Sequence, residues 1–208
     1  MFYPIYLNLE NKRVVVIGGG EVAERKVESL IGTGAAITVI SPEITPLLDS
    51  LAGENKIRIH RRAYATGDCE GAALVFSATD DADVSRAVFS EAATAGALVN
   101  TADQPELCDF IMPAVVRRGD VAIAVSTGGT SPGLAAQLRN KIAGIVGPEY
   151  ALLGELLSQS RREIRCRVPD PLQRKALHNR ILNSDIIDRL KRNDRAGAER
   201  RLREIIES

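Results

Sequence analysis

Three consecutive glycines near the start of the chain are spaced as a phosphate-binding turn. The chain reads Gly18-x-Gly20-x-x-Ala23, which is the G-x-G-x-x-G/A form of a dinucleotide fingerprint. Gly18 permits a tight turn, Gly20 lets the backbone approach a pyrophosphate, and Ala23 lets a helix pack closely on a strand. The free N–H groups at the start of that helix would then face the phosphates. The alternative is a glycine-rich turn that binds nothing.

The segments around these glycines favour the binding turn. Val14–Ile17 is a β-branched run typical of a strand buried on both faces. Apolar residues follow at helical spacing, at Ala23, Val27 and Leu30, and Ala36–Ile40 reads as a second parallel strand. A strand, a helix and a strand within about 30 residues predict an α/β fold with a Rossmann-type, doubly wound parallel sheet.

The residues after the second strand bear on which dinucleotide binds. A Rossmann enzyme usually places Asp or Glu there for the ribose 2′-hydroxyl, whereas this chain reads Ser41-Pro42-Glu43. The acid is either displaced by two residues or replaced by Ser41. Because no arginine in this turn could meet a 2′-phosphate, NAD is favoured over NADP; Arg61 and Arg62 come only after the next strand.

A later strand delivers polar side chains to the same edge of the sheet. Ala73–Ser77 runs into Thr79 and Asp80, which we expect near the cofactor because the carboxyl ends of the strands line the ligand crevice. Asp81 is the better candidate for the N-cap of the next helix, and Asp80 suits either role.

Asp103 is the candidate catalytic carboxylate. It follows the fifth strand, Leu98–Val99, and so reaches the crevice, where a carboxylate can serve as a general base. An ordinary loop or turn residue is the alternative interpretation. Asp109 is a competing candidate of the same kind.

A second anion-binding concavity follows a predicted β-hairpin. Val115–Val116 and Val121–Val125 flank a short polar turn, and a helix then begins after Ser131, which is a good N-cap. Hydroxyls, glycines and a helix N-terminus together suit a polycarboxylate; a capped helix after a flexible loop is the alternative. The candidate substrate-binding residues are Thr127, Gly128, Gly129, Thr130 and Ser131.

Composition excludes several classes of protein. Lys plus Arg and Asp plus Glu each number 27 among 208 residues, so nothing global argues for nucleic acid. No apolar run approaches the roughly 20 residues of a membrane helix, and the first residues lack the basic region of a signal peptide. Cys69, Cys108 and Cys166 form no C-x-x-C pair, which argues against a resident metal site and favours the reducing cytoplasm.

The chain is expected to have three parts. Residues 1–112 would form the NAD-binding Rossmann domain. Residues 113–147 would form a small α+β dimerisation segment, because an isolated hairpin is marginally stable and needs a partner surface. Residues 148–208, where glycine nearly vanishes and charge rises, would form a C-terminal helical domain.

Taken together, these motifs resemble the precorrin-2 dehydrogenase and sirohydrochlorin ferrochelatase family, which makes siroheme. The resemblance covers about residues 1 to 145 and lies in Gly18–Lys26, Ala78–Asp81, Asn100–Asp103, Phe110–Ala114 and Ser126–Pro132.

The resemblance implies an NAD-dependent oxidation of precorrin-2 to sirohydrochlorin, and in many members the insertion of ferrous iron, which binds only transiently. It also implies a homodimer joined through the middle segment. Cofactor contacts would fall to Glu21 and Val22 and to Pro42 and Glu43, and the catalytic aspartate to Asp103. Where some members carry a phosphorylatable serine, this chain has Thr127.

Two other functions remain open. One is a dehydrogenase without chelatase activity. The other is a non-catalytic NAD-sensing regulatory domain, which would share the first Rossmann half but would not need the stretch from Asn100 to Pro132.

Overall fold

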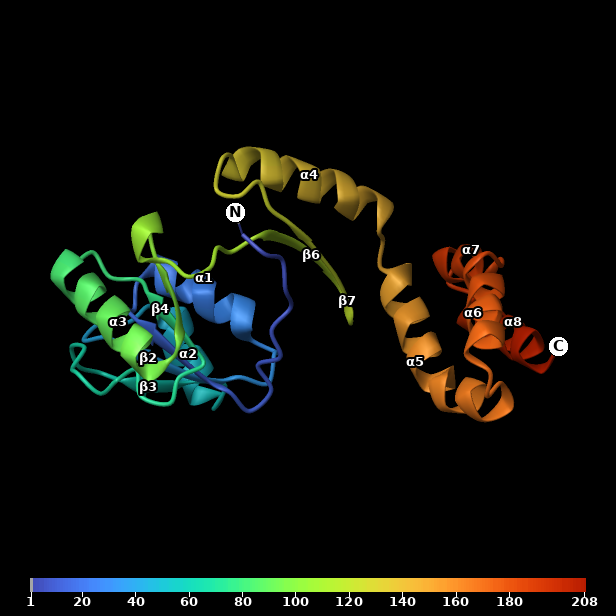
Figure 1. Cartoon of the computed structure of the whole chain (residues 1–208), viewed down its shortest axis with the longest axis horizontal. Helices are drawn as coiled ribbons and strands as arrows, with labels where there is room; N and C mark the ends of the chain where they lie inside the picture. Colours follow the sequence, from blue (N-terminus) through green and yellow to red (C-terminus); the bar gives the residue numbers. More distant parts are fainter. Residues whose placement is uncertain (1) are drawn as a thin grey trace. The chain divides into compact units, whose positions relative to one another are not determined.

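A five-stranded parallel sheet organises the first part of the chain (Figure 1). The computed structural model describes residues 2–208. Neighbouring strands pair in the order β3-β2-β1-β4-β5. The strands are β1 Arg13–Ile17, β2 Ala36–Ile40, β3 Arg58–His60, β4 Leu74–Ser77 and β5 Leu98–Thr101.

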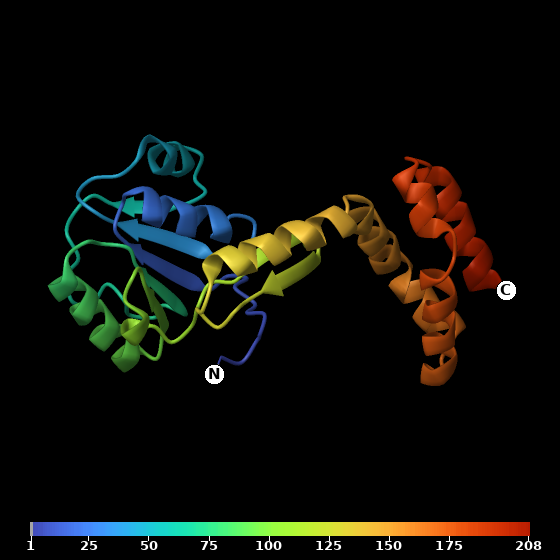
Figure 2. The ribbon, with the colours of Figure 1, turned by 90° about the horizontal axis from the view of Figure 1, so that it is seen from above.

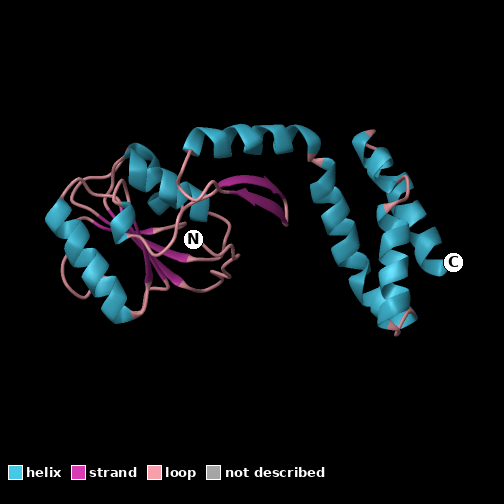
Figure 3. Cartoon of the chain, turned by 45° about the horizontal axis from the view of Figure 1, so that its top comes forward, coloured by secondary structure: helices cyan, strands magenta, loops and turns pink. Residues whose placement is uncertain are grey.

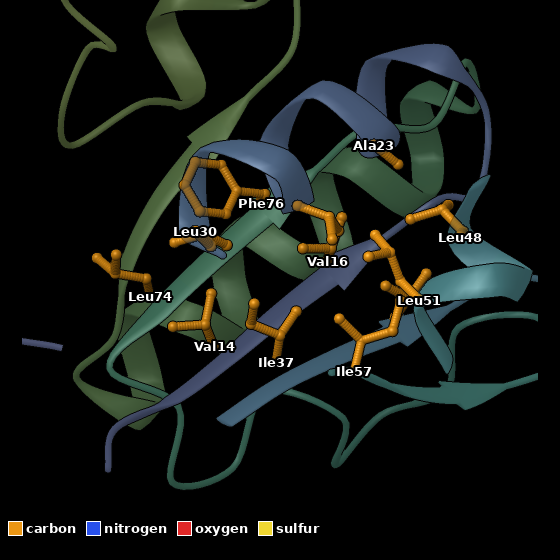
Figure 4. Close-up of a cluster of buried hydrophobic side chains, with 12 residues drawn as sticks. Val14, Val16, Ala23, Leu30, Ile37, Leu48, Leu51, Ile57, Leu74 and Phe76 are labelled. Atoms are coloured by element: carbon orange, nitrogen blue, oxygen red, sulfur yellow. The ribbon is translucent and has the colours of Figure 1, made fainter. Parts of the chain in front are cut away.

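Helices cover both faces of this sheet, so the predicted doubly wound α/β fold is confirmed. The helices are α1 Glu21–Leu30, α2 Pro46–Gly53 and α3 Ala82–Ala95. Val14 and Val16 of β1 pack with α1 and α2 on one face (Figure 4), whereas Val15 packs with α3 on the other. This alternation explains why the β1 run has no polar residue.

The sequence interpretation missed α2 altogether. Its start carries a recognisable signal, since the Thr45 hydroxyl accepts a hydrogen bond from the Leu48 N–H and Pro46 occupies the first turn. The helix buries Leu48 and Leu51 against the sheet.

A hairpin and a helix open the second compact unit, Met112–Ser208. Strands β6 (Ala114–Arg118) and β7 (Val121–Val125) are antiparallel, and α4 (Pro132–Ile145) runs beside them (Figure 2). The Arg118 guanidinium donates to the carbonyls of Val146, at 3.0 Å, and Ala143, at 3.4 Å, which closes the end of α4.

Four helices complete this unit (Figure 3). They surround a core to which Leu156, Ile164 and Leu202 contribute. None of the helices in residues 2–208 is both long enough and apolar enough to cross a bilayer. The helices are α5 Glu149–Arg167, α6 Pro171–Leu182, α7 Ile186–Lys191 and α8 Arg195–Glu207.

Candidate active site

The glycine turn after β1 is fixed by backbone packing. Gly18 has a φ of 115°, and its N–H donates to the carbonyl of Ile40 at 2.9 Å. A Cβ at Gly18 would overlap the carbonyl oxygen of Ala78, and one at Gly19 would overlap that of Glu43. Both glycines are therefore required where the ends of β1, β2 and β4 meet.

Gly20 is different, because a Cβ there would meet nothing within 4 Å. It is the N-cap residue of α1 and gives that helix no side-chain cap. Side chains of Thr45, Asp81 and Ser131 do cap α2, α3 and α4. An uncapped helix start beside open space fits the pyrophosphate of a dinucleotide, since it offers free N–H donors and a positive dipole end.

The turn after β2 folds over the glycines. The Thr45 N–H donates to the Gly19 carbonyl at 3.0 Å. Ser41 is buried, while Pro42 and Glu43 are exposed, so the carboxylate of Glu43 is accessible to a ligand.

Thr79 and Asp80 lie at the carboxyl end of β4. The Thr79 hydroxyl accepts the Asp81 N–H at 3.3 Å. The predicted cap is confirmed at Asp81, whose Oδ1 accepts the N–H groups of Asp83 and Val84. Asp80 is exposed and takes no part in that cap, so its carboxylate is available at the edge of the sheet.

Asp103 lies in a short loop after β5. It is exposed and has a left-handed backbone, with a φ of 57°, a conformation that Asp tolerates better than most residues. Cys108 closes the loop: its Sγ lies 3.2 Å from the Thr101 carbonyl oxygen and 3.3 Å from that of Gln104. The loop thus holds the Asp103 carboxylate out from the sheet edge.

The competing candidate, Asp109, is engaged by the backbone. Its Oδ2 accepts the Val99 N–H at 2.9 Å, and its own N–H donates to the Val99 carbonyl at 2.9 Å. These bonds extend the pairing of β5.

Lys26 is a residue of this region to which sequence reasoning gave no role. Its ammonium donates to Asn100 Oδ1 at 3.0 Å and lies 5.5 Å from the centre of the Phe76 ring. Asn100 in turn donates to the Phe110 carbonyl at 2.9 Å. Lys26 therefore ties α1 to the segment that brackets the Asp103 loop.

Burial lowers the pKa of Lys26, and the nearby Cys108 and Asp103 oppose that shift. The signal in the sequence was its position in α1, three residues after the buried Ala23 and next to the buried Val27. A lysine beside the buried face of a helix packs its aliphatic part against apolar neighbours and extends its ammonium to a polar partner.

The loop of Thr127 to Ser131 belongs to the second unit. Its hydroxyls bond within the loop: Thr127 Oγ1 accepts the Ser131 N–H at 3.1 Å, and Ser131 Oγ accepts the Leu134 N–H at 3.2 Å. Gly128 and Gly129 have positive φ and open space around them, so the backbone stays accessible there.

Among residues 2–208, no group of three His, Cys, Asp or Glu side chains could hold a metal ion. Cys69, Cys108 and Cys166 are free thiols. Cys69 lies in the core. This burial raises the pKa of its thiol to about 12, so the thiol stays protonated at neutral pH.

Three family models match the chain in succession. The first, described as "Putative NAD(P)-binding", covers residues 5–114. The second, "Sirohaem biosynthesis protein central", covers residues 118–144, and the third, "Sirohaem synthase dimerisation region", covers residues 149–206.

The relatives with similar sequences are named siroheme synthase. The chain is 40% identical over 181 residues to the siroheme synthase of Methylococcus capsulatus, covering 87% of this chain and 38% of that protein. It is 41% identical over 172 residues to that of Methylobacillus flagellatus, covering 83% and 37% respectively. The chain thus spans about two fifths of the length of these relatives.

A solved structure, "SirC, precorrin-2 dehydrogenase", has the same fold, with a TM-score of 0.77, 24% identity and 99% of each chain covered. The NAD(P)-binding match agrees with the uncapped glycine turn. With all three models matched in order, the chain belongs to the sirohaem biosynthesis family, in the NAD(P)-binding, central and dimerisation parts of siroheme synthase.

Proposed function

We propose that this protein oxidises precorrin-2 to sirohydrochlorin with NAD as the hydride acceptor. The observation that carries the proposal is the placement of Asp103 in a strained, exposed loop after β5, in the same parallel sheet as the uncapped glycine turn that follows β1. Ligands of open α/β sheets bind outside the carboxyl ends of the strands, which supports a shared binding crevice for both features.

The dinucleotide would be held mainly by backbone. Gly18 and Gly20, with the N–H groups of Glu21 and Val22, would bind the pyrophosphate. The turn of Ser41, Pro42 and Glu43 would contact the adenosine ribose. Thr79 and Asp80 would line the cofactor on the side of β4.

NAD is preferred over NADP because the two arginines that follow the carboxyl end of β3, the strand beside β2, are already paired. Arg61 forms an ion pair with Asp49 at 2.7 Å, and Arg62 forms one with Asp68 at 2.6 Å. A 2′-phosphate would have to compete with these carboxylates for a guanidinium.

Asp103 acts as the general base. Oxidation of the macrocycle removes a hydride and a proton; the bound dinucleotide supplies the hydride acceptor, and the Asp103 carboxylate accepts the proton. Precorrin-2 is a polycarboxylate, and the Thr127–Ser131 loop, with its exposed glycine backbone, would bind some of its carboxylates.

Ferrochelation is the second candidate activity. It is supported by the name siroheme synthase that relatives of this chain carry and by the accessible Asp103 carboxylate, which can accept protons from the ring nitrogens. Ferrous iron would enter transiently as a substrate. A protein of this function would work in the cytoplasm as a homodimer, in keeping with its dimerisation-region match and its free thiols.

The test is to mix the purified protein with precorrin-2 and either NAD or NADP and to follow the tetrapyrrole spectrum. We expect conversion to sirohydrochlorin with NAD and slower conversion with NADP. An unchanged spectrum in the presence of bound NAD would favour the NAD-sensing alternative instead.

A second experiment distinguishes a dehydrogenase that is also a ferrochelatase from a dehydrogenase alone. Ferrous iron is added to sirohydrochlorin with and without the protein. Acceleration of siroheme formation by the protein would assign the chelatase activity, and equal rates would leave a dehydrogenase alone.

A further inference from the structure

A basic groove lies between α5 and α6, in the second unit. It has a volume of about 370 Å³ and is lined by Arg161 and Arg165 from α5 and by Arg174, Lys175 and His178 from α6. Ile164, Pro171 and Asn179 complete its lining, which contains no carboxylate.

Several other arginines of the C-terminal helices do pair with carboxylates. Arg189 pairs with Asp185 at 2.7 Å, Arg195 with Glu155 at 2.9 Å, and Arg201 with Glu204 at 3.0 Å. These arginines are therefore neutralised by acids of the same helical unit.

The groove cations are not neutralised in this way. In the described part of the chain, Arg161, Arg165 and Lys175 form no ion pair with a carboxylate, whereas Arg174 donates to the Val168 carbonyl at 2.9 Å. Several positive charges therefore face the same space without a counter-charge.

These cations are close enough to repel one another when no anion occupies the groove. Arg161 and Arg165 are four residues apart on α5, so they lie about 6 Å apart along that helix, and Arg174 and Lys175 are adjacent on α6. Like charges at this spacing destabilise a helix. An anion that bridged the two helices would remove that repulsion.

We propose that the groove between α5 and α6 binds an organic polycarboxylate. Its cations stand in two separated rows, which suits an anion whose acidic groups are spread over a scaffold better than a compact phosphate. Arg161 and Arg165 provide the planar donor forks that match carboxylates. The choice of a tetrapyrrole as this polycarboxylate rests on the proposed function. The proposal that the groove binds a polycarboxylate rests on its own cations.

The experiment measures binding of uroporphyrin, a tetrapyrrole octacarboxylate, to the full chain by fluorescence titration. The double variant Arg161→Gln/Arg165→Gln should bind at least about tenfold more weakly, since it loses two charge-assisted contacts. Lys175→Gln, on the opposite wall, should weaken binding independently. A control double variant, Arg200→Gln/Arg203→Gln, removes two exposed arginines of α8 and should bind as the unaltered chain does.

Two further arms identify the anion. Coproporphyrin, with four carboxylates, should bind more weakly than uroporphyrin, and inorganic pyrophosphate should not displace uroporphyrin at equal concentration. Displacement by pyrophosphate, or tighter binding of a single-stranded RNA, would overturn the assignment to a polycarboxylate. Equal uroporphyrin affinity in the groove variants and the control, with unchanged circular dichroism, would overturn the site.

Asp103→Asn separates this proposal from the proposed function. Groove-dependent binding should persist in that variant, because Asp103 belongs to the other unit. A chain that binds uroporphyrin through the groove but does not oxidise precorrin-2 would refute the enzyme function and retain the groove.

Discussion

At the scale of single residues, Gly18 and Gly20 serve different ends. Gly18 has a positive φ and faces a backbone carbonyl, so the fold itself requires a glycine there. Gly20 has an ordinary φ of −82° and open space beside it, so the fold does not require a glycine there, and we propose that the missing side chain leaves room for the ligand. The fingerprint in the sequence had already given the tight turn to Gly18 and the approach to a pyrophosphate to Gly20.

Alanine at each position should therefore have opposite effects. Gly18→Ala should lower stability by about 1–3 kcal/mol or more, because the residue is strained and its Cβ meets backbone. Gly20→Ala should keep the melting temperature and weaken NAD binding about tenfold, a loss of about 1.4 kcal/mol. Thermal unfolding and calorimetric titration measure both, and tight NAD binding by Gly20→Ala would argue against this pyrophosphate site.

We predict that Lys26 positions Asp103 through the segment that Asn100 holds. Lys26→Met removes the 3.0 Å bond to Asn100 while keeping an unbranched aliphatic side chain on α1. We expect turnover of precorrin-2 to fall about tenfold, which is the cost of about 1.4 kcal/mol of misplacement, while NAD affinity stays unchanged.

Lys26→Arg should restore part of this loss, because a guanidinium can still donate to Asn100. The control is Lys12→Met, at an exposed lysine outside the helix. Equal turnover in Lys26→Met and in the control would show that the lysine has no positioning role.

At the scale of elements, two carboxylates hold the connection between β3 and β4: Glu91 of α3, which accepts the N–H groups of Gly67 and Cys69, and Asp68. Asp68 accepts from both Arg62 nitrogens, at 2.7 and 2.6 Å, and from the Ala65 N–H at 2.8 Å. These bonds, the one from Arg62 above all, lower the pKa of Asp68. Because the folded pKa lies below the unfolded one, this stabilisation is complete above about pH 4 and is lost as the pH falls through the folded pKa.

Asp68→Asn should lower the free energy of unfolding by about 1–2 kcal/mol at neutral pH, because it leaves the Arg62 fork without its carboxylate. The difference from the unaltered chain should shrink in acid, where Asp68 is protonated in any case. Urea unfolding at several pH values measures it. Asp49→Asn breaks the exposed pair with Arg61 and should cost less than about 0.5 kcal/mol; a similar loss in both variants would contradict this account.

Helix α4 presents an apolar stripe that nothing in its own unit covers. Leu134 is 46% exposed, Leu138 38% and Ile145 74%, and these residues lie beside a two-stranded hairpin that is short of packing partners. We predict that Leu138→Asp converts a homodimer to monomers in light scattering. Leu47→Asp, at a residue of α2 that is 37% exposed, should leave the dimer intact, and a Leu138→Asp dimer would place the interface elsewhere.

The elements that sequence reasoning identified are those whose pattern is local. A few neighbouring residues are enough to recognise three of these features: the apolar run of β1, the glycine at Gly18 and the Ser131 cap of α4. Helix α2 was missed although its Thr45–Pro46 start is equally local. Lys26 could not be given its role, because its partner Asn100 is 74 residues away in the chain and only the parallel pairing of β4 with β5 brings them together.

At the scale of the whole molecule, the chain consists of two compact units, one up to Ile111 and one from Met112 to Ser208. The cofactor turn and Asp103 lie in the first, and the hairpin, the Thr127–Ser131 loop and the basic groove lie in the second. The division of the second unit into a dimerisation segment and a helical domain stays a prediction.

The proposed oxidation of precorrin-2 requires Asp103 and NAD to act together on one macrocycle. The most direct measurement is a single-turnover reaction of the NAD-bound protein with precorrin-2, followed by NADH absorbance, for the unaltered chain and for Asp103→Asn. We predict one NADH per sirohydrochlorin in the first and a rate at least about 100-fold lower in the second, with NAD affinity and melting temperature unchanged. An Asp103→Asn protein that turns over at nearly the unaltered rate would contradict the account.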